Sequence, residues 1–388
     1  MTHRLRLLLI TVSTLIFGTV VAAEQSRLRA TPLFTISYPP PQFGISDYGN
    51  VAFSEQFAFI GTDGGLFRAA LPISKSTQAR RVAFESTPVT GLAYRAGALY
   101  ASLDIDHPTG PGATDRALLK SLDDGITWTP IDDQLEECYG AYCERLQSSQ
   151  IALADDRIFV NAGGNVIVSD DDGASWNVLF GHTSNGKPQG QACYDPAFAL
   201  VGQRLLLGGE CPLDSAYLRT GTLNADLLDW QSEPESAQTP FLENRNVQFI
   251  RQRGDSNVVY AGIEGALMRS DDAGASYDFL LFYEGDAPKY PYITHILFPS
   301  QHSTAIIIGG FDKANGGPFL SVSFDNGATW IDQSNLLPGV GREQWSVTKL
   351  EETPSGQLIV GAEDDEAGAL HLFELTIGNA GRRRSVRH

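Results

Sequence analysis

One eight-residue pattern recurs along this chain in a fixed phase, and it constrains the fold more than any other feature. The pattern reads S-x-D-x-G-x-[ST]-[WY] and occupies residues 121–128, 169–176, 270–277 and 323–330. The copies start 48, 101 and 53 residues apart, so the middle interval holds two periods and one copy has decayed, near Thr220. The chain is therefore built from tandem units of about 50 residues.

The segments around the pattern repeat as well. A β-rich run leads into each copy, and another run that ends in small residues lies upstream, as at 258–262 and 306–310. The chain has 39 Gly and 20 Pro but only 2 Met, which favours many turns and short strands over helices. Repeats of about 40–50 residues with several strands each are typical of a β-propeller. We expect an all-β, seven-bladed β-propeller with four-stranded antiparallel blades over residues 24–378.

Closure of the ring needs one more strand. The seventh unit ends after its third strand, near Ile377, and residues 33–38 precede the first unit. This N-terminal segment is predicted to supply the outer strand of the last blade, which would bury two open sheet edges.

Each octapeptide has the chemistry of a tight turn. Its Gly can adopt a positive φ, the Asp two residues earlier can accept backbone N–H bonds, and the final Trp or Tyr can pack between neighbouring sheets. The residues given this structural role are Asp123, Gly125, Trp128, Asp171, Gly173, Trp176, Asp272, Gly274, Asp325, Gly327 and Trp330. We expect these turns to stabilise the fold and not to catalyse a reaction or bind a metal.

On these four copies the chain resembles the Asp-box, or BNR-repeat, β-propellers. That group includes sialidases, sortilin-type receptor domains and photosystem II assembly factors. The resemblance covers residues 24–378 and implies the fold. It does not imply one function, because the same turn occurs in binding proteins and in enzymes.

Both ends of the chain carry segments outside the repeat. Arg4 and Arg6 precede an apolar run over 7–21, and small residues at 21–23 form a cleavage site for signal peptidase. This pattern predicts a signal peptide over 1–23, with an uncleaved membrane anchor as the alternative. Residues 379–388 form a basic tail that we expect to be flexible. The protein is thus expected to be exported, to the periplasm or the medium, as a monomer with no transmembrane segment after cleavage.

The four cysteines agree with export. Disulfides are expected for Cys138 with Cys143 and for Cys193 with Cys211, although four cysteines allow three pairings. The net charge of −18 argues against a nucleic-acid partner, which would need clustered Lys and Arg.

The long connections of such a propeller lie at one end of the blades, where binding residues are commonly found. We expect three arginines near inner strands to point to the central channel and hold a carboxylate, with separate surface arginines as the alternative. Aromatic and acidic side chains share this end. The candidate ligand-binding residues are Arg145, Arg245, Arg342, Tyr139, Tyr142, Trp345, Asp104 and Asp106.

These residues leave two functions open. The first is a non-catalytic binding or assembly propeller for a protein or carbohydrate. The second is a sialidase-like glycoside hydrolase, which needs an arginine triad, an acid/base carboxylate and a Tyr–Glu pair or second carboxylate. The Arg-Ile-Pro signature of that family is absent near residues 28–32. A metal-dependent binder that uses Asp104, Asp106 and residues 363–366 ranks last, and we assign no catalytic residue, metal or cofactor.

Overall fold

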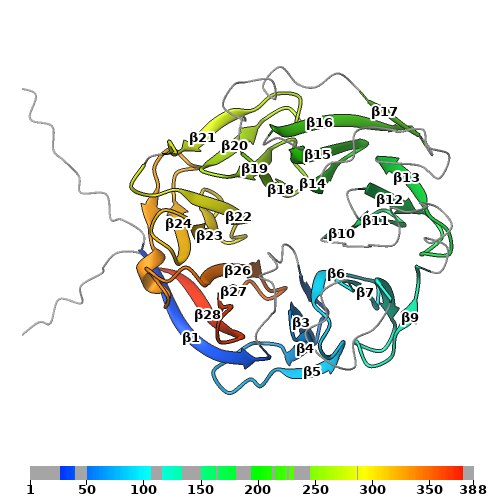
Figure 1. The fold of residues 1–388 in the computed structure, drawn as a ribbon, viewed down its shortest axis with the longest axis horizontal. Coiled ribbons are helices and arrows are strands. Elements are labelled where there is room, and N and C mark those ends of the chain that lie inside the picture. The colour runs from blue at the N-terminus through cyan, green and yellow to red at the C-terminus, as the bar shows by residue number, and fades with distance from the viewer. Residues whose placement is uncertain are drawn as a thin grey trace, which may run out of the picture.

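The computed structural model describes residues 27–39, 50–105, 116–132, 150–162, 165–180, 194–211, 215–224, 227–230, 245–285 and 287–378. Their strands form seven four-stranded antiparallel sheets arranged around a central axis, with the first strand of a blade nearest the centre (Figure 1). The seven-bladed propeller that the repeat predicts is therefore confirmed.

The blades follow the chain in order. Blades 1 to 4 are β2 (Val51–Phe53), β3 (Phe57–Thr62), β4 (Gly65–Ala70) and β5 (Arg80–Ala83); β6 (Val89–Arg95), β7 (Ala98–Leu103), β8 (Leu118–Ser121) and β9 (Thr129–Pro130); β10 (Gln150–Ala154), β11 (Arg157–Ala162), β12 (Asn165–Ser169) and β13 (Asn177–Phe180); and β14 (Tyr194–Val201), β15 (Arg204–Cys211), β16 (Ser215–Asn224) and β17 (Leu227–Trp230).

Blades 5 and 6 are β18 (Val247–Gln252), β19 (Val259–Ile263), β20 (Ala266–Ser270) and β21 (Asp278–Phe282); and β22 (Pro291–Leu297), β23 (Ile306–Asp312), β24 (Pro318–Ser323) and β25 (Ile331–Asp332). Blade 7 contains β26 (Trp345–Glu352), β27 (Leu358–Asp364), β28 (Ala369–Gly378) and, as its outer strand, β1 (Arg27–Ser37).

The N-terminal strand closes the ring, as expected. β1 pairs with β28 in antiparallel register from Arg27 opposite Gly378 to Ser37 opposite Ala369. The strand begins six residues earlier than the predicted start at Leu33, so the closure is longer than the sequence indicated. Because the two ends of the ring share one sheet, opening the ring requires that this whole ladder be broken.

The core lies between adjacent blades. The second strands are buried along nearly their whole length; all six residues of β7 and all five of β19 are buried. Such strands are apolar without alternation because neighbouring blades cover both faces of each sheet. Large side chains such as Phe59, Phe159 and Tyr260 are fully enclosed there.

The octapeptides form turns between the third and fourth strands. Asp272 shows the arrangement: its carboxylate accepts hydrogen bonds from the Ser276 amide at 2.8 Å, the Ser276 hydroxyl at 2.6 Å and the Ser270 hydroxyl at 2.8 Å. Gly274 follows with φ +84°. The turns at Asp123, Asp171 and Asp325 repeat these bonds.

Each of these turns also contacts the preceding blade. The buried Tyr277 belongs to the same core cluster as Leu206 of blade 4. The Trp176 indole N–H donates to the Ile131 carbonyl of blade 2 at 2.8 Å. The Trp128 ring lies 4.6 Å from the Phe84 ring, which follows blade 1. The repeated turns therefore hold the blades together as well as reversing the chain.

Blade 4 departs from the pattern. In the four regular copies the first Ser is the last residue of the third strand, but Thr220 lies four residues before the end of β16. The strand continues past the position of the lost turn. The Thr220 hydroxyl instead donates to the Gly274 carbonyl of blade 5 at 3.2 Å, so a blade-to-blade contact persists there.

Candidate functional site

The antiparallel order gives each blade two kinds of connection at opposite ends. We call the end with the second-to-third-strand and inter-blade connections the loop face, and the opposite end, which carries the octapeptide turns, the turn face. No helix among the described ranges is long and apolar enough to cross a membrane.

On the loop face, side chains from blades 5 and 6 form a surface of aromatic rings and cations. We call it the blade 5–6 surface, and it consists of Arg245, Phe282, Tyr290, Tyr292 and Lys313. Lys313 is exposed, Phe282 is 38% exposed, and the other three side chains are half-buried. An aromatic ring that is partly exposed and partly packed against the protein is suited to contact a ligand.

Arg245 organises one half of this surface. Its guanidinium lies over the Phe282 ring at 4.5 Å and the Tyr290 ring at 5.7 Å. The same group donates to the Glu264 carbonyl at 2.9 Å and to the Tyr283 carbonyl at 3.2 Å. The expectation that Arg245 points into the central channel is wrong, because β21, which contributes Phe282, is the outer strand of its blade.

Tyr292 organises the other half. Its hydroxyl accepts a hydrogen bond from the Lys313 ammonium at 2.6 Å, and its ring lies 6.1 Å from the Tyr290 ring at 71°. Burial raises the pKa of Tyr292, and its hydrogen bond to Glu264 acts in the same direction. The hydrogen bond to Tyr292 raises the pKa of Lys313. The surface therefore carries two positive side chains at neutral pH.

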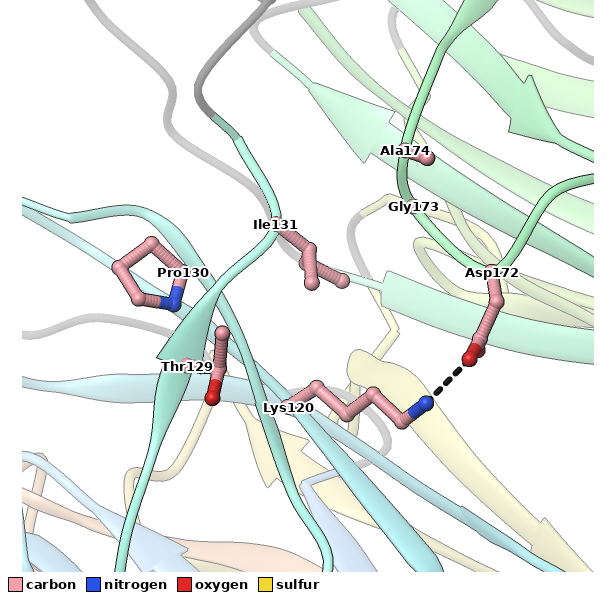
Figure 2. A pocket seen from close by; sticks show the side chains of 7 residues that line it. All are labelled: Lys120, Thr129, Pro130, Ile131, Asp172, Gly173 and Ala174. Atoms are coloured by element: carbon pink, nitrogen blue, oxygen red, sulfur yellow. Dashed lines mark hydrogen bonds and ion pairs between the residues drawn. The ribbon is translucent and has the colours of Figure 1, made fainter.

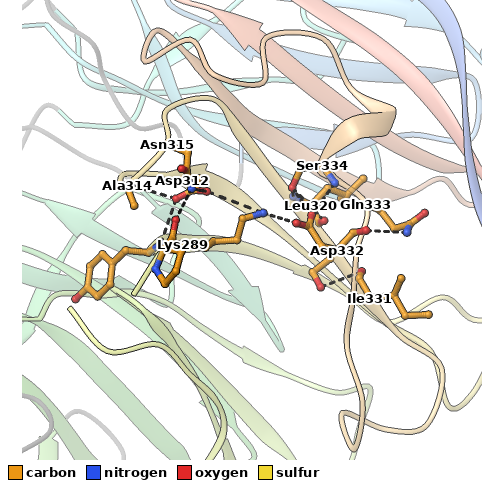
Figure 3. A network of polar contacts seen from close by, with 12 residues as sticks. Lys289, Asp312, Ala314, Asn315, Leu320, Ile331, Asp332, Gln333 and Ser334 are labelled. Carbon is orange, nitrogen blue, oxygen red and sulfur yellow. Dashed lines mark hydrogen bonds and ion pairs between the residues drawn. The ribbon is translucent and has the colours of Figure 1, made fainter. Parts of the chain in front are cut away.

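A polar network below this surface fixes the loops that carry it (Figure 3). The buried Asp312 carboxylate accepts hydrogen bonds from the Tyr290 amide at 3.1 Å and the Asn315 side chain at 2.9 Å. The Lys289 ammonium bonds to Asp332 and lies 4.0 Å from Asp312. One carboxylate thus ties the connection before β22 to the connection after β23, so the tyrosines are held in place.

The other proposed ligand residues do not join this surface. Arg342 is exposed in the connection between β25 and β26. Trp345 is only 6% exposed and stacks on His371 with 5.1 Å between ring centroids, so its assignment as a ligand platform is wrong. Asp104 is 4% exposed and therefore does not form part of an open acidic loop.

Several expectations fall outside the described residues. They concern Arg145, Tyr139, Tyr142, Asp106, Cys138, Cys143 and Cys193, the segment 1–23 and the tail 379–388. Cys211 lies at the end of β15, but its side chain is not described.

A buried polar cluster joins blade 7 to the closing strand. The Tyr38 hydroxyl, just after β1, donates to the Glu363 carboxylate, and the Lys349 ammonium lies 4.0 Å from that carboxylate. Burial raises the pKa of Glu363 to about 8, with a smaller contribution from Asp365. Tyr38 and Glu363 are 6% and 3% exposed. This Tyr–Glu pair is enclosed, so a glycoside could not reach its hydroxyl.

A groove of about 390 Å³ lies on the turn-face side between blades 2 and 3 (Figure 2). Lys120, Thr129, Pro130 and Ile131 form one side, and the turn 172–174 forms the other. The Lys120 ammonium pairs with the Asp172 carboxylate across it. Asp172 also accepts a hydrogen bond from the Tyr100 hydroxyl at 2.6 Å.

Neither a family model nor a curated protein matches the chain. Solved structures do. The WD40 β-propeller domain of Doa1 matches with TM-score 0.51 and 10% identity over 88% of this chain and 97% of that one. A chain of the mitotic checkpoint complex matches with TM-score 0.58 and 12% identity, over 96% of this chain and 99% of that one.

A third structure is the extracellular domain of a hybrid two-component system from B. thetaiotaomicron. It matches with TM-score 0.54 and 12% identity over 89% of this chain and 40% of that one. At these identities the likeness establishes the propeller fold and nothing finer.

The sequence pointed to part of this site. The inter-blade connection that carries Tyr290 and the connection that carries Lys313 both follow from the strand pattern as long loops. Phe282 and the network of Lys289, Asp312 and Asp332 were missed. Their position gave a signal, because Phe282 ends the strand before the first of these loops, Lys289 lies within that loop, and Asp312 ends the strand before the second.

Proposed function

We propose that this chain is an exported, non-catalytic binding propeller that holds a protein partner on the blade 5–6 surface. The observation that carries the proposal is the position of two tyrosines, a phenylalanine, an arginine and a lysine on one partly open surface with a rigid support. Tyr and Arg are the residues that most often dominate the energy of protein interfaces.

Two further points support a protein partner. The faces of the Phe282 and Tyr292 rings already lie near cations, which leaves less open ring surface for a sugar to stack on. A propeller of the same fold is present in the mitotic checkpoint complex. For export, the support is the signal-peptide pattern of residues 1–23 and the extracellular propeller among the neighbours.

The test uses the purified full chain, immobilised and exposed to envelope and secreted proteins of its source cell, with a glycan array in parallel. The double variant Phe282→Ala with Lys313→Ala removes two exposed side chains of the surface. Val340→Ala is the control, because Val340 is 57% exposed in another inter-blade connection of the same face. We expect one protein to bind the native chain and the control near stoichiometry, and the double variant at least tenfold more weakly.

Other outcomes would overturn the proposal. Equal retention by the double variant would place the binding site elsewhere on the molecule. Binding to a glycan that is lost in the double variant would identify a carbohydrate as the ligand in place of a protein.

A further inference from the structure

The octapeptide turn of blade 2 differs from the other three at its second and sixth positions. The second and sixth residues are Leu122 and Ile126 in blade 2, and the corresponding pairs are Asp170 with Ala174, Asp271 with Ala275, and Phe324 with Ala328. Leu122 is 73% exposed and Ile126 is 62% exposed. Phe324, the large apolar residue of another copy, instead packs against the core beside blade 7. Two large apolar side chains therefore project from one turn into solvent.

The two strands that flank this apolar turn line the groove between blades 2 and 3. Leu122 follows Lys120 by two residues, and Lys120 with its strand partner Thr129 lines the groove. Figure 2 shows Pro130 and Ile131 on the same side and the turn of blade 3 opposite. The groove has a volume of about 390 Å³, which is enough for one or two side chains of a partner.

The surroundings of the turn and groove are acidic. Asp123 and Asp124 lie on the turn of blade 2, and residues 170–172 are three consecutive Asp on the turn of blade 3. Lys120 is the cation that lines the groove, and it already pairs with Asp172. Arg68 also donates to the Asp124 carbonyl at 2.7 Å, and the charge of Arg95 acts on Asp172. Five carboxylates therefore stand against three cations here, and the charge complements a basic partner.

We propose that Leu122, Ile126 and the adjoining groove form a second docking surface, which takes a protein segment with apolar side chains flanked by Lys or Arg. The apolar side chains of the partner cover Leu122 and Ile126, and its cations face Asp170 and its neighbours. This surface lies on the turn face, so it is separate from the blade 5–6 surface and does not depend on the function proposed for that surface. The propeller then connects two partners through opposite ends.

The test measures fluorescence polarisation of three fluorescein-labelled peptides, GKLRLKG, GKSRSKG and GELELEG, with the purified full chain at low and physiological salt. The double variant Leu122→Ser with Ile126→Ser removes the apolar turn. Both side chains are exposed, so we expect the variant to keep the thermal stability of the native chain. Val340→Ser is the matched control, because it removes an exposed apolar side chain from the opposite face.

We expect GKLRLKG to bind the native chain and the Val340→Ser control equally, and to bind the double variant about tenfold or more weakly. Asp170→Asn should weaken binding a few-fold and reduce its salt dependence, because one carboxylate is neutralised. The proposal is overturned if the native chain does not bind GKLRLKG, or if the double variant binds it equally. It is also overturned if GKSRSKG or GELELEG binds as tightly, since charge alone or apolar contact alone would then explain the affinity.

Discussion

Replacing Gly274 by Ala tests how closely the repeated turns fit against the preceding blade. Gly274 has φ +84°, and a Cβ at this position would lie 2.4 Å from Leu206 Cδ2 and 3.0 Å from its Cδ1. Leu206 is 1% exposed in the middle of β15, so it has little room to move. The left-handed backbone costs an alanine about 1–2 kcal/mol. Overpacking of a filled core adds about 1–3 kcal/mol.

Gly97→Ala is the matched control. Gly97 has φ +87° in the turn between β6 and β7, and no atom lies within 4 Å of the position of its Cβ. This variant therefore carries the backbone cost alone. We expect the free energy of unfolding to fall by about 2–5 kcal/mol in Gly274→Ala and by about 1–2 kcal/mol in Gly97→Ala. Urea titration followed by tryptophan fluorescence measures both values.

A third variant separates the clash from other effects. Leu206→Ala combined with Gly274→Ala removes the Leu206 atoms that the new Cβ meets. The free energy of unfolding should therefore fall less in the double variant than the sum of the losses in the two single variants, by about 1–3 kcal/mol. Equal losses for Gly274→Ala and Gly97→Ala, or strict additivity in the double variant, would refute the close fit between blades.

Three further predictions concern protons and hydrogen bonds. Tyr38→Phe removes the hydroxyl that bonds to Glu363, so the free energy of unfolding should fall by about 1–2 kcal/mol, and an unchanged urea midpoint would contradict this. The pKa of Glu363 is raised from 4.5 to about 8 by burial, so ionisation is disfavoured in the folded state; stability should decline by at most about 1.4 kcal/mol per pH unit as pH rises through this range, and Glu363→Gln should flatten that decline. Urea titrations of both proteins at several pH values measure the slopes, and parallel slopes would count against the assignment. Hydrogen bonds from Thr127 lower the pKa of Asp123 from 3.8 to about 2, so its stabilisation is present above pH 3.8 and is lost as pH falls toward 2. Asp123→Asn should remove this acid-dependent change, which exchange of the Thr127 amide with solvent would report.

The repeat predicted which segment closes the ring but did not predict how long that strand is. The missing fourth strand of the seventh unit required a partner from elsewhere, and the N-terminal segment was the available one. The length of the ladder was missed because Pro32 interrupts the segment, and a proline usually argues against a continuing strand. The pairing of residues 27–32 depends on β28. Thr220 shows a related limit, since the loss of a turn pattern does not reveal that the strand continues through it.

Burial was harder to predict than strand order. Trp345 and Glu363 stand at the ends of strands beside long connections, a position that favours exposure. In the folded chain His371 covers Trp345, and Tyr38 from the closing strand reaches Glu363. The contacts that enclose these two side chains come from segments far along the chain or from another strand of the blade.

The sequence by itself determined the number of blades, the chemistry of their turns and the strand that closes the ring. These properties depend on local periodicity and on residues a few positions apart. The tertiary structure alone decided which side chains share a surface. Arg245, Phe282, Tyr290 and Lys313 meet because adjacent blades bring separate loops together. Leu122 and Ile126 stay exposed although Trp128 of the same turn packs against Phe84 beside blade 1.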